Sequence, residues 1–434
     1  MPATPDTGTD TDIAGLPAIL GGAPAVTLDQ DAANLWPDLG PADEAAVLAV
    51  MRDRNISTHP VIRELEDDYR QFTGMPHALA HNNGTAALLA AFFALDLKPG
   101  DEILVPTATF WASVLPMAWC GLVPVFCESE TERLGLDPED LERKITDRTR
   151  AIVVVHLWGL PSKMTEIFAV AERHGLKIIE DASHAHGATW RGRPCGSLGD
   201  ISMFSLQGDK LAPAGEGGIF LCRDDAYLER ATLLGDITRI IELETPARRF
   251  AATSFGIKTR IAPLSAAIGR VQLAALAAHN AKRNANLLYL SEKLESMGFD
   301  TFLPPDHIER VYFEYLIRFR PDRVPLPLPI LVRALQAEGC LVAAPRYPLV
   351  HQQPFFTEGH YLGVARLPAD LAPPVYDPAD LPRTQQGNAT LIKLPSFPLA
   401  ERALLDQYAS AFARVIAHAD AILASPAGQE AAPA

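Results

Sequence analysis

The sequence of 434 residues has no excess of positive charge, which proteins that bind DNA or RNA usually carry. Lysine and arginine number 38 against 53 aspartates and glutamates, so the formal net charge is -15. No block of basic residues interrupts this acidic background. The phosphates of a nucleic acid would be repelled by such a chain, and we exclude nucleic acid as a partner.

Closely spaced cysteines and long apolar runs are also missing. The five cysteines are scattered at Cys120, Cys127, Cys195, Cys222 and Cys340, without the close pairs that zinc or iron–sulfur sites need, so we expect no metal. No segment approaches the about 20 uninterrupted apolar residues of a membrane span. The N-terminal MPATPDTGTDTD has neither a basic start nor an apolar stretch, so we expect no secretory signal. These absences favour a soluble, cytoplasmic protein without a membrane partner.

Short apolar segments alternate with helical ones over the first half of the chain. The expected strands are Glu102–Val105, Val123–Cys127, Ala151–His156, Lys177–Asp181 and Ile201–Leu206. The β-branched run from Ala151 is typical of a strand buried on both faces. The alternation predicts an α/β fold with a mostly parallel sheet covered by helices, and ligands at the carboxyl ends of the strands.

The pattern turns helical after Asp225. The further elements that we expect are helices at Pro41–Met51, Val61–Phe72, Thr109–Cys120, Leu264–Ala278, Arg283–Met297, Ile330–Glu338 and Arg402–Ile422, and a strand at Val311–Arg320. We expect a disordered tail over residues 1–15, a large domain over 16–275, a smaller α+β domain over 276–423 and a disordered tail over 424–434.

One lysine, Lys210, stands between the expected strand Ile201–Leu206 and a glycine-rich run, Gly215–Gly218. A lysine that follows a buried strand lies in apolar surroundings, which disfavour its charged form and lower its pKa. A neutral amine of this kind can attack an aldehyde and form a Schiff base. A surface lysine beside a turn is the alternative, and it is the commoner case for a lone lysine.

Other candidate residues fall where strands end or helices begin. The run from Asn83 through Gly84, Thr85 and Ala86 opens a helix whose unpaired amides suit a phosphate, although an ordinary capped helix fits equally well. Phe110 follows a strand end and is either a stacking ring or a core residue.

Asp181 ends the strand Lys177–Asp181, where a buried carboxylate requires a cationic partner such as a protonated pyridine nitrogen; a turn aspartate is the alternative. His184 follows closely and can reach a ring hydroxyl, and the hydroxyl of Ser205 can join the phosphate contacts. A phosphate cradle, a stacking ring, a buried acid and a Schiff-base lysine together indicate pyridoxal 5'-phosphate (PLP).

At these positions the chain resembles the DegT/StrS family of PLP-dependent sugar and aminocyclitol aminotransferases, which have the aspartate-aminotransferase fold (fold type I). The resemblance is carried by NNGTAAL (82–88), DEILVPTATF (101–110), LDPEDLERKITDRTRAIVVVHLWG (136–159), IEDASHAHGA (179–188), GSLGDISMFSLQGDKLAPAGEGG (196–218) and KLPSFP (393–398). It implies a seven-stranded type of sheet, a smaller C-terminal lobe and a homodimer with shared active sites.

The resemblance also implies a role for each candidate. Lys210 would form the Schiff base, Asp181 would hold the pyridinium proton, and Phe110 would stack on the ring. Ser205, Gly84, Thr85 and Ala86 resemble the family's phosphate contacts, and His184 stands near the ring hydroxyl. The chain departs from the family in GIKTR (256–260), where Lys258 replaces an asparagine that reaches the partner's phosphate. Lys258 contacts either that phosphate or the acceptor, and a solvated lysine at the interface is the alternative.

The implied reaction moves an amino group from glutamate or glutamine to a keto-sugar or keto-cyclitol. A nucleotide-sugar acceptor, a PLP-dependent dehydratase of the same fold and a regulatory protein without turnover are the alternatives. Lys210 argues against the dehydratases, because the sugar 3-dehydratases that resemble this family have histidine in its place.

Overall fold

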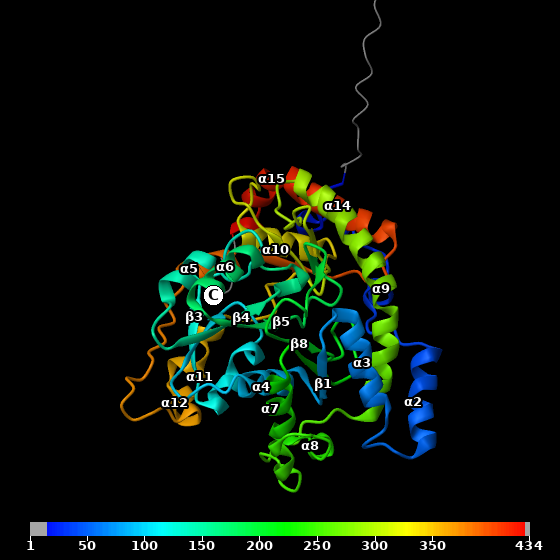
Figure 1. Ribbon diagram of the computed structural model, residues 1–434. Helices are drawn as coiled ribbons and strands as arrows, with labels where there is room; N and C mark the ends of the chain where they lie inside the picture. Colours follow the sequence, from blue (N-terminus) through cyan, green and yellow to red (C-terminus); the bar gives the residue numbers. More distant parts are fainter. Residues whose placement is uncertain (1–14, 430–434) are drawn as a thin grey trace, which may run out of the picture.

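The computed structural model describes residues 15–429, and a seven-stranded sheet lies at its centre (Figure 1). The strands run in the order β1–β9–β8–β5–β4–β2–β3. Their bounds are β1 His77–His81, β2 Glu102–Pro106, β3 Val123–Cys127, β4 Thr149–Val155, β5 Lys177–Asp181, β8 Ile201–Ser205 and β9 Gly218–Cys222. Only β9 is antiparallel to its neighbours, β1 and β8. The predicted α/β fold with a mostly parallel sheet is confirmed.

Helices cover this sheet. The helices that accompany it are α2 Pro41–Asp53, α3 Val61–Thr73, α4 Gly84–Ala94, α5 Pro138–Lys144, α6 Met164–His174, α7 Asp225–Gly235 and α8 Ile237–Ile240. The apolar helix α4 packs against β8 and β9, and α3 packs against β1. The five residues Ala151–Val155 of β4 are all buried, as their β-branched composition predicts.

The carboxyl ends of β2, β4, β5 and β8 meet at one edge of the sheet, because these strands are parallel. Strand β1 has the same direction as β8, since both are antiparallel to β9, and it delivers the start of α4 to that edge. His81 and Ser205 pair with Gly218 from opposite sides. A Cβ on Gly218 would lie 2.4 Å from the Asn83 carbonyl oxygen, so glycine is needed for α4 to begin this close to β9.

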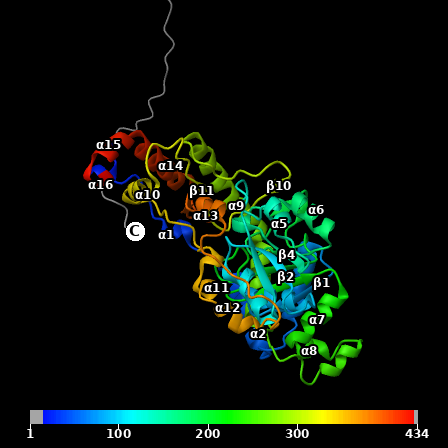
Figure 2. The same ribbon diagram turned by 90° about the vertical axis from the view of Figure 1, so that its left-hand side faces the viewer.

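A long helix, α9 (Pro263–Ser296), joins two hydrophobic clusters. Its first half contributes Ala266, Ala267 and Leu276 to the cluster around the sheet. Its second half contributes Leu287, Leu290 and Leu294 to a cluster with helices of the C-terminal region. Figure 2 shows those helices gathered at one end of the molecule, away from the sheet. The domain boundary expected at residue 275 stays a prediction, because α9 runs through it.

The remaining elements lie mostly in the C-terminal region or connect it to the sheet. The helices are η1 Ala18–Leu20, α1 Asp31–Asn34, α10 Leu328–Ala337, α11 Pro354–Thr357, α12 His360–Ala365, α13 Pro382–Asn388, α14 Arg402–Ala417, α15 Ala419–Ala424 and α16 Pro426–Gln429, with short 3-10 turns at η4 Leu157–Gly159, η5 Pro246–Phe250 and η6 Val350–Gln352. Strands β6 Thr189–Trp190, β7 Arg193–Pro194 and β10 Ile308–Glu309 form one small sheet, and β11 Tyr315–Arg318 pairs with β12 Leu391–Leu394. No helix within residues 15–429 is long and apolar enough to cross a membrane.

Several local predictions were wrong. The expected helix pair Leu264–Ala278 and Arg283–Met297 is the single helix α9, because no glycine or proline interrupts residues 279–282 and Asn280 Nδ2 donates to the His186 carbonyl outside the helix. The helix expected at Thr109–Cys120 is two 3-10 helices, η2 (Trp111–Ser113) and η3 (Leu115–Cys120); Pro116 has no N–H to bond back across Val114.

Near the C-terminus, a strand and a helix are shorter than predicted. The strand expected at Val311–Arg320 is confined to β11, since the amides of Val311 and Phe313 bond to the carbonyls of Gly159 and Trp158 in the large lobe. The helix expected at Arg402–Ile422 divides at His418 into α14 and α15. The expected tail over residues 1–15 lies outside the described residues except for Gly15, and residues 430–434 of the expected C-terminal tail lie outside them too.

Candidate active site

A cavity of about 800 Å³ opens at the carboxyl edge of the sheet. Residues from the C-terminal region, Arg346 to Pro348, form its other side. It is lined by seven of the nine predicted site residues, Gly84, Thr85, Phe110, Asp181, His184, Ser205 and Lys210. The structure therefore brings together residues that lie more than 120 positions apart in the sequence.

The Lys210 side chain is buried in this cavity, with 8% of its surface exposed. Its ammonium nitrogen lies 4.1 Å from the centre of the Phe313 ring. Burial lowers the pKa of Lys210 to about 8, although the Asp181 carboxylate acts in the opposite direction. Trp36 donates its indole N–H to the Lys210 carbonyl at 2.9 Å and fixes the loop. Lys210 therefore loses its proton at a lower pH than an ordinary lysine does, which favours its use as a nucleophile or base.

Asp181 is buried at the end of β5, with its carboxylate facing the cavity. Ser113 donates its hydroxyl to Oδ2 at 2.7 Å, and the Ser183 amide donates to Oδ1 at 3.1 Å. Among the described residues no lysine, arginine or histidine forms a salt bridge with Asp181. A buried carboxylate with two neutral donors and a face open to the cavity is suited to a cationic ligand.

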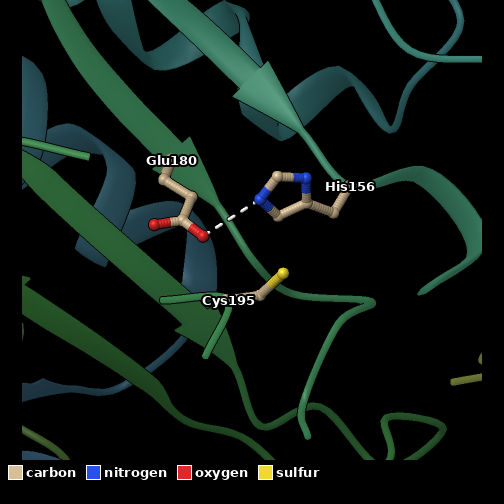
Figure 3. A group of neighbouring side chains, drawn as sticks. All are labelled: His156, Glu180 and Cys195. Atoms are coloured by element: carbon tan, nitrogen blue, oxygen red, sulfur yellow. Dashed lines mark hydrogen bonds and ion pairs between the residues drawn. The ribbon is translucent and has the colours of Figure 1, made fainter. Parts of the chain in front are cut away.

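Glu180 precedes Asp181 and points to the opposite face of the sheet, where it lies beside His156 and Cys195 (Figure 3). His156 Nε2 donates to Glu180 at 3.0 Å, and the amides of Gly196, Leu198 and Gly199 and the Ser202 hydroxyl donate to the same carboxylate. The other ring nitrogen of His156 accepts from the Ser162 amide. Both imidazole nitrogens of His156 and both carboxylate oxygens of Glu180 thus have hydrogen-bond partners. These side chains stabilise the turn that leads into β8 and do not form a metal site.

His184 stacks on Phe313, with ring centres 4.1 Å apart. Its Nδ1 accepts from the Trp158 amide at 3.3 Å, and the Tyr347 hydroxyl lies 3.4 Å from Nε2. Burial, with the nearby charge of Lys210, lowers the pKa of His184 well below 6.5. The imidazole is therefore neutral, and it contacts a ligand through hydrogen bonding rather than charge.

The first turn of α4 approaches Ser205 closely. A Cβ on Gly84 would lie 2.8 Å from the Ser205 Cβ, so the side-chain-free position lets the helix start reach the cavity wall. Asn83 caps the helix by accepting the Ala86 amide at 2.8 Å, while the amides of Gly84 and Thr85 precede the first intrahelical bond. Helix polarity and these amides make the position suited to an anion.

Two of the predicted contacts do not line the cavity. Ala86 lies behind its wall, with its amide bonded to Asn83, and lines an adjacent groove with Trp111 and Trp119. Lys258 is exposed and does not line the cavity of its own chain. Phe110 is 39% exposed at the cavity edge, next to Trp111. The roles assigned to these three residues stay predictions.

Several lining residues were not among the predicted ones, chiefly Ser113, Arg346 and Tyr347. Arg346 and Tyr347 come from a proline-rich connection without a periodic pattern, so no sequence signal marked them. Ser113 was hidden within the segment interpreted as a helix. The sequence offered one clue, since a buried acid such as Asp181 needs a donor and the TATFWAS segment supplies hydroxyls.

The sequence model of the "DegT/DnrJ/EryC1/StrS aminotransferase family" matches residues 37–406. GDP-perosamine synthase from Caulobacter vibrioides is 38% identical over 59% of this chain and 68% of its own. L-glutamine:2-deoxy-scyllo-inosose aminotransferase from Streptomyces lividus is 33% identical over 66% of this chain and 69% of its own. The X-ray structure of an aminotransferase from Psychrobacter cryohalolentis is similar at a TM-score of 0.78 and 27% identity, covering 88% of this chain and 98% of that one.

The lowered pKa of Lys210 is open to direct measurement. In the cofactor-free protein, we expect acetic anhydride to label Lys210 with a half-maximal rate near pH 8, because burial favours the neutral amine, whereas exposed lysines require a higher pH. Labelling is followed by mass spectrometry between pH 6 and 11, with the exposed Lys98 as internal comparison. A profile for Lys210 that coincides with that of Lys98 would contradict the assignment.

The Glu180 network predicts a large effect on stability. Burial alone would raise the pKa of Glu180, but its hydrogen bonds with His156, the turn amides and Ser202 hold it below 4.5. In Glu180→Gln, the amide NH2 would face the N–H and O–H groups that now donate to the carboxylate. The substitution should therefore lower the free energy of unfolding by about 3 kcal/mol or more at pH 7.

The stabilisation by Glu180 is present above pH 4.5 and is lost as the pH falls through the lower folded-state pKa. The difference between wild type and Glu180→Gln in urea unfolding should therefore shrink in acid. Glu242→Gln, which changes an exposed carboxylate, is the control and should have little effect. Equal stability of the two variants would rule out the network as the support of this turn.

Proposed function

This chain belongs to the DegT/DnrJ/EryC1/StrS aminotransferase family, and we propose that it transfers the amino group of glutamate or glutamine to a ketone carbon of a sugar or cyclitol. It is a PLP-dependent aminotransferase, as the family assignment and its aminotransferase relatives establish. The finer proposal is carried by one observation, the cavity in which a neutralisable lysine and an unpaired buried carboxylate face the same space.

The residues of the cavity fit PLP. Asp181 offers a carboxylate without a cationic partner to the pyridinium nitrogen, and Phe110 offers a ring face for stacking. The amides of Gly84 and Thr85 and the Ser205 hydroxyl surround the position for the phosphate. Bound PLP supplies an aldehyde that holds the amino nitrogen and a ring that withdraws electrons from the neighbouring carbon.

The protein's own groups bind, orient and move protons. With its pKa lowered to about 8, neutral Lys210 Nζ would take a proton from the amino-bearing carbon of the donor and would later deliver a proton to the carbon of the acceptor. Ser113 orients the Asp181 carboxylate by donating to it, and this carboxylate would stabilise a proton on the ring nitrogen. Neutral His184, oriented by the Trp158 amide, is available to the ring hydroxyl. Phe313 and Tyr347 cover the site and exclude water from Lys210.

The acceptor is a neutral, oxygen-rich ring. One named relative makes a GDP-linked amino sugar and another aminates an inosose with glutamine, which supports a ketone acceptor of this class and glutamine as a donor. We favour a cyclitol or free sugar, because the relative that aminates an inosose uses an acceptor without a nucleotide. We expect the enzyme to work in the cytoplasm, consistent with five unpaired cysteines.

The active enzyme in this proposal is a homodimer with shared sites. Large apolar side chains are exposed near the cavity, Trp111 at 44% and Trp119 at 76%, and Phe255 and Ile257 are exposed just before Lys258. Exposed apolar groups of this size are typical of protein interfaces. In a dimer, Lys258 enters the partner's site and contacts the cofactor phosphate or the acceptor.

The proposed function is tested by the two half-reactions. Glutamate or glutamine alone should convert the cofactor to its amino form, followed by absorbance, and a keto-cyclitol, free keto-sugar or nucleotide-linked keto-sugar should restore it. Asp181→Asn should reduce kcat by at least about 100-fold while the circular dichroism spectrum is unchanged, because the ring loses its charge partner. Borohydride reduction and peptide mapping should locate the cofactor on Lys210; a failure of every donor to react would reject the proposal.

The shared site is tested by complementation. Lys258→Asn should weaken cofactor retention about 10-fold, or raise the acceptor KM, since a positive charge near phosphate or hydroxyls is lost. Co-expression of Lys210→Ala with Lys258→Asn should then restore one wild-type site in each mixed dimer. If Lys258 serves the site of its own chain, the mixed dimers will show no gain in activity.

A further inference from the structure

Arg346 is a cation in the cavity wall that the steps above do not use. It comes from the C-terminal region, yet its Cζ lies 5.6 Å from the centre of the Phe313 ring that also contacts Lys210 Nζ. Both cationic groups thus lie against one ring, within reach of a single small molecule. Lys210 and Arg346 line the same cavity, so a substrate that reacts beside Lys210 occupies a space that Arg346 also lines.

Arg346 has two counter-ions of different character. Nε is 2.5 Å from Glu314 Oε1, and the Glu314 side chain is only 7% exposed and also lies 3.5 Å from Lys393. Nη1 is 3.1 Å from Asp209 Oδ2, and the Asp209 side chain is 54% exposed. Burial holds Glu314 in place, whereas Asp209 can turn to solvent at little cost. Neither ion pair uses Nη2.

The charges around Arg346 balance only while Asp209 is in contact. Arg346 and Lys393 share the single charge of Glu314, so the departure of Asp209 leaves one positive charge at the cavity. Burial alone would lower the pKa of Arg346, but Glu314, Tyr347 and Asp209 together outweigh it and raise that pKa, so the guanidinium stays charged. A planar guanidinium with an exchangeable partner is well suited to a carboxylate.

The two substrates of the reaction differ in charge at this position. An amino acid donor carries a carboxylate on the carbon that bears its nitrogen, while the ketone of a sugar or cyclitol has uncharged ring carbons there. Both must occupy the same cavity in turn. An arginine that faced the acceptor without a counter-ion would be desolvated and unpaired, which is costly.

We propose that Arg346 binds the α-carboxylate of the amino donor, and that Asp209 takes the place of this carboxylate when the acceptor is bound. Arg346 is then a determinant of donor specificity, and Asp209 allows one cavity to accept an anionic and a neutral substrate alternately. The inference rests on the proposed transfer from an amino acid donor to a neutral ring.

The main test separates donor from acceptor kinetics. In Arg346→Gln, the donor KM should rise about 10- to 100-fold, because a charge-assisted hydrogen bond is lost. The acceptor KM should change less than about 2-fold. Arg346→Lys keeps the charge but lacks the planar guanidinium, so its donor KM should lie between those of the wild type and Arg346→Gln. Arg173→Gln, which changes an exposed arginine on α6, is the matched control and should leave all constants unchanged.

Asp209→Asn tests the counter-ion. It removes the competitor for Arg346, so the donor KM should fall several-fold, while the acceptor KM rises because Arg346 then keeps only the charge of Glu314 that it shares with Lys393. An unchanged donor KM in Arg346→Gln, or an equal rise in both substrate constants, would overturn the role of Arg346. If the donor KM and the acceptor KM are both unchanged in Asp209→Asn, the proposal that Asp209 and the donor carboxylate exchange as partners of Arg346 is wrong.

Equilibrium binding of glutarate, a dicarboxylate without an amine, gives a readout that does not depend on turnover. Calorimetric titration of the cofactor-loaded wild type should show binding that Arg346→Gln weakens at least about 10-fold and Arg173→Gln leaves intact. If no donor reacts with the wild type, the proposed function fails, and the glutarate titration still decides whether Arg346 is a carboxylate site. Arg346-independent binding of glutarate would reject that site.

Discussion

Two adjacent carboxylates at the end of β5 determine how the rest of the site is built. The alternation of side chains along a strand sends Glu180 to one face of the sheet and Asp181 to the other. Glu180 accepts hydrogen bonds from His156, which follows β4, and from the turn before β8. It therefore fixes the positions of β4, β5 and β8 relative to one another. The Asp181 carboxylate faces the cavity, and the side that is not bonded to Ser113 is open to a ligand. The structural carboxylate thus makes the functional carboxylate rigid.

The low pKa of Lys210 is a property of both lobes of the chain. The strand before it delivers the lysine to the sheet edge, but Phe313, from beyond α9, covers its ammonium group. The same ring supports His184 and contacts Arg346. An amine of lowered pKa, a neutral imidazole and a charged guanidinium therefore share one apolar surface. Burial lowers the pKa of Lys210 and of His184, whereas Glu314, Tyr347 and Asp209 keep the pKa of Arg346 raised.

The features of the site that sequence could reveal are those that depend on local order. Strand ends and helix starts of a parallel sheet meet at one edge, so Thr85, Asp181 and Ser205 could be grouped from their positions alone. Arg346 and Phe313 could not, since they reach the cavity through long-range packing that leaves no periodic trace. The strand β9 was missed because its apolar residues follow directly on a glycine run that reads as a loop. The continuity of α9 depends on tertiary hydrogen bonds to Asn280.

The unbroken length of α9 has a mechanical consequence. The 34-residue helix α9 is buried in both hydrophobic clusters and forms a rigid connection between them. Turning one cluster relative to the other would require several backbone hydrogen bonds of α9 to break. The helix therefore opposes rotation of one cluster relative to the other, and it ties the stability of the C-terminal cluster to that of the sheet.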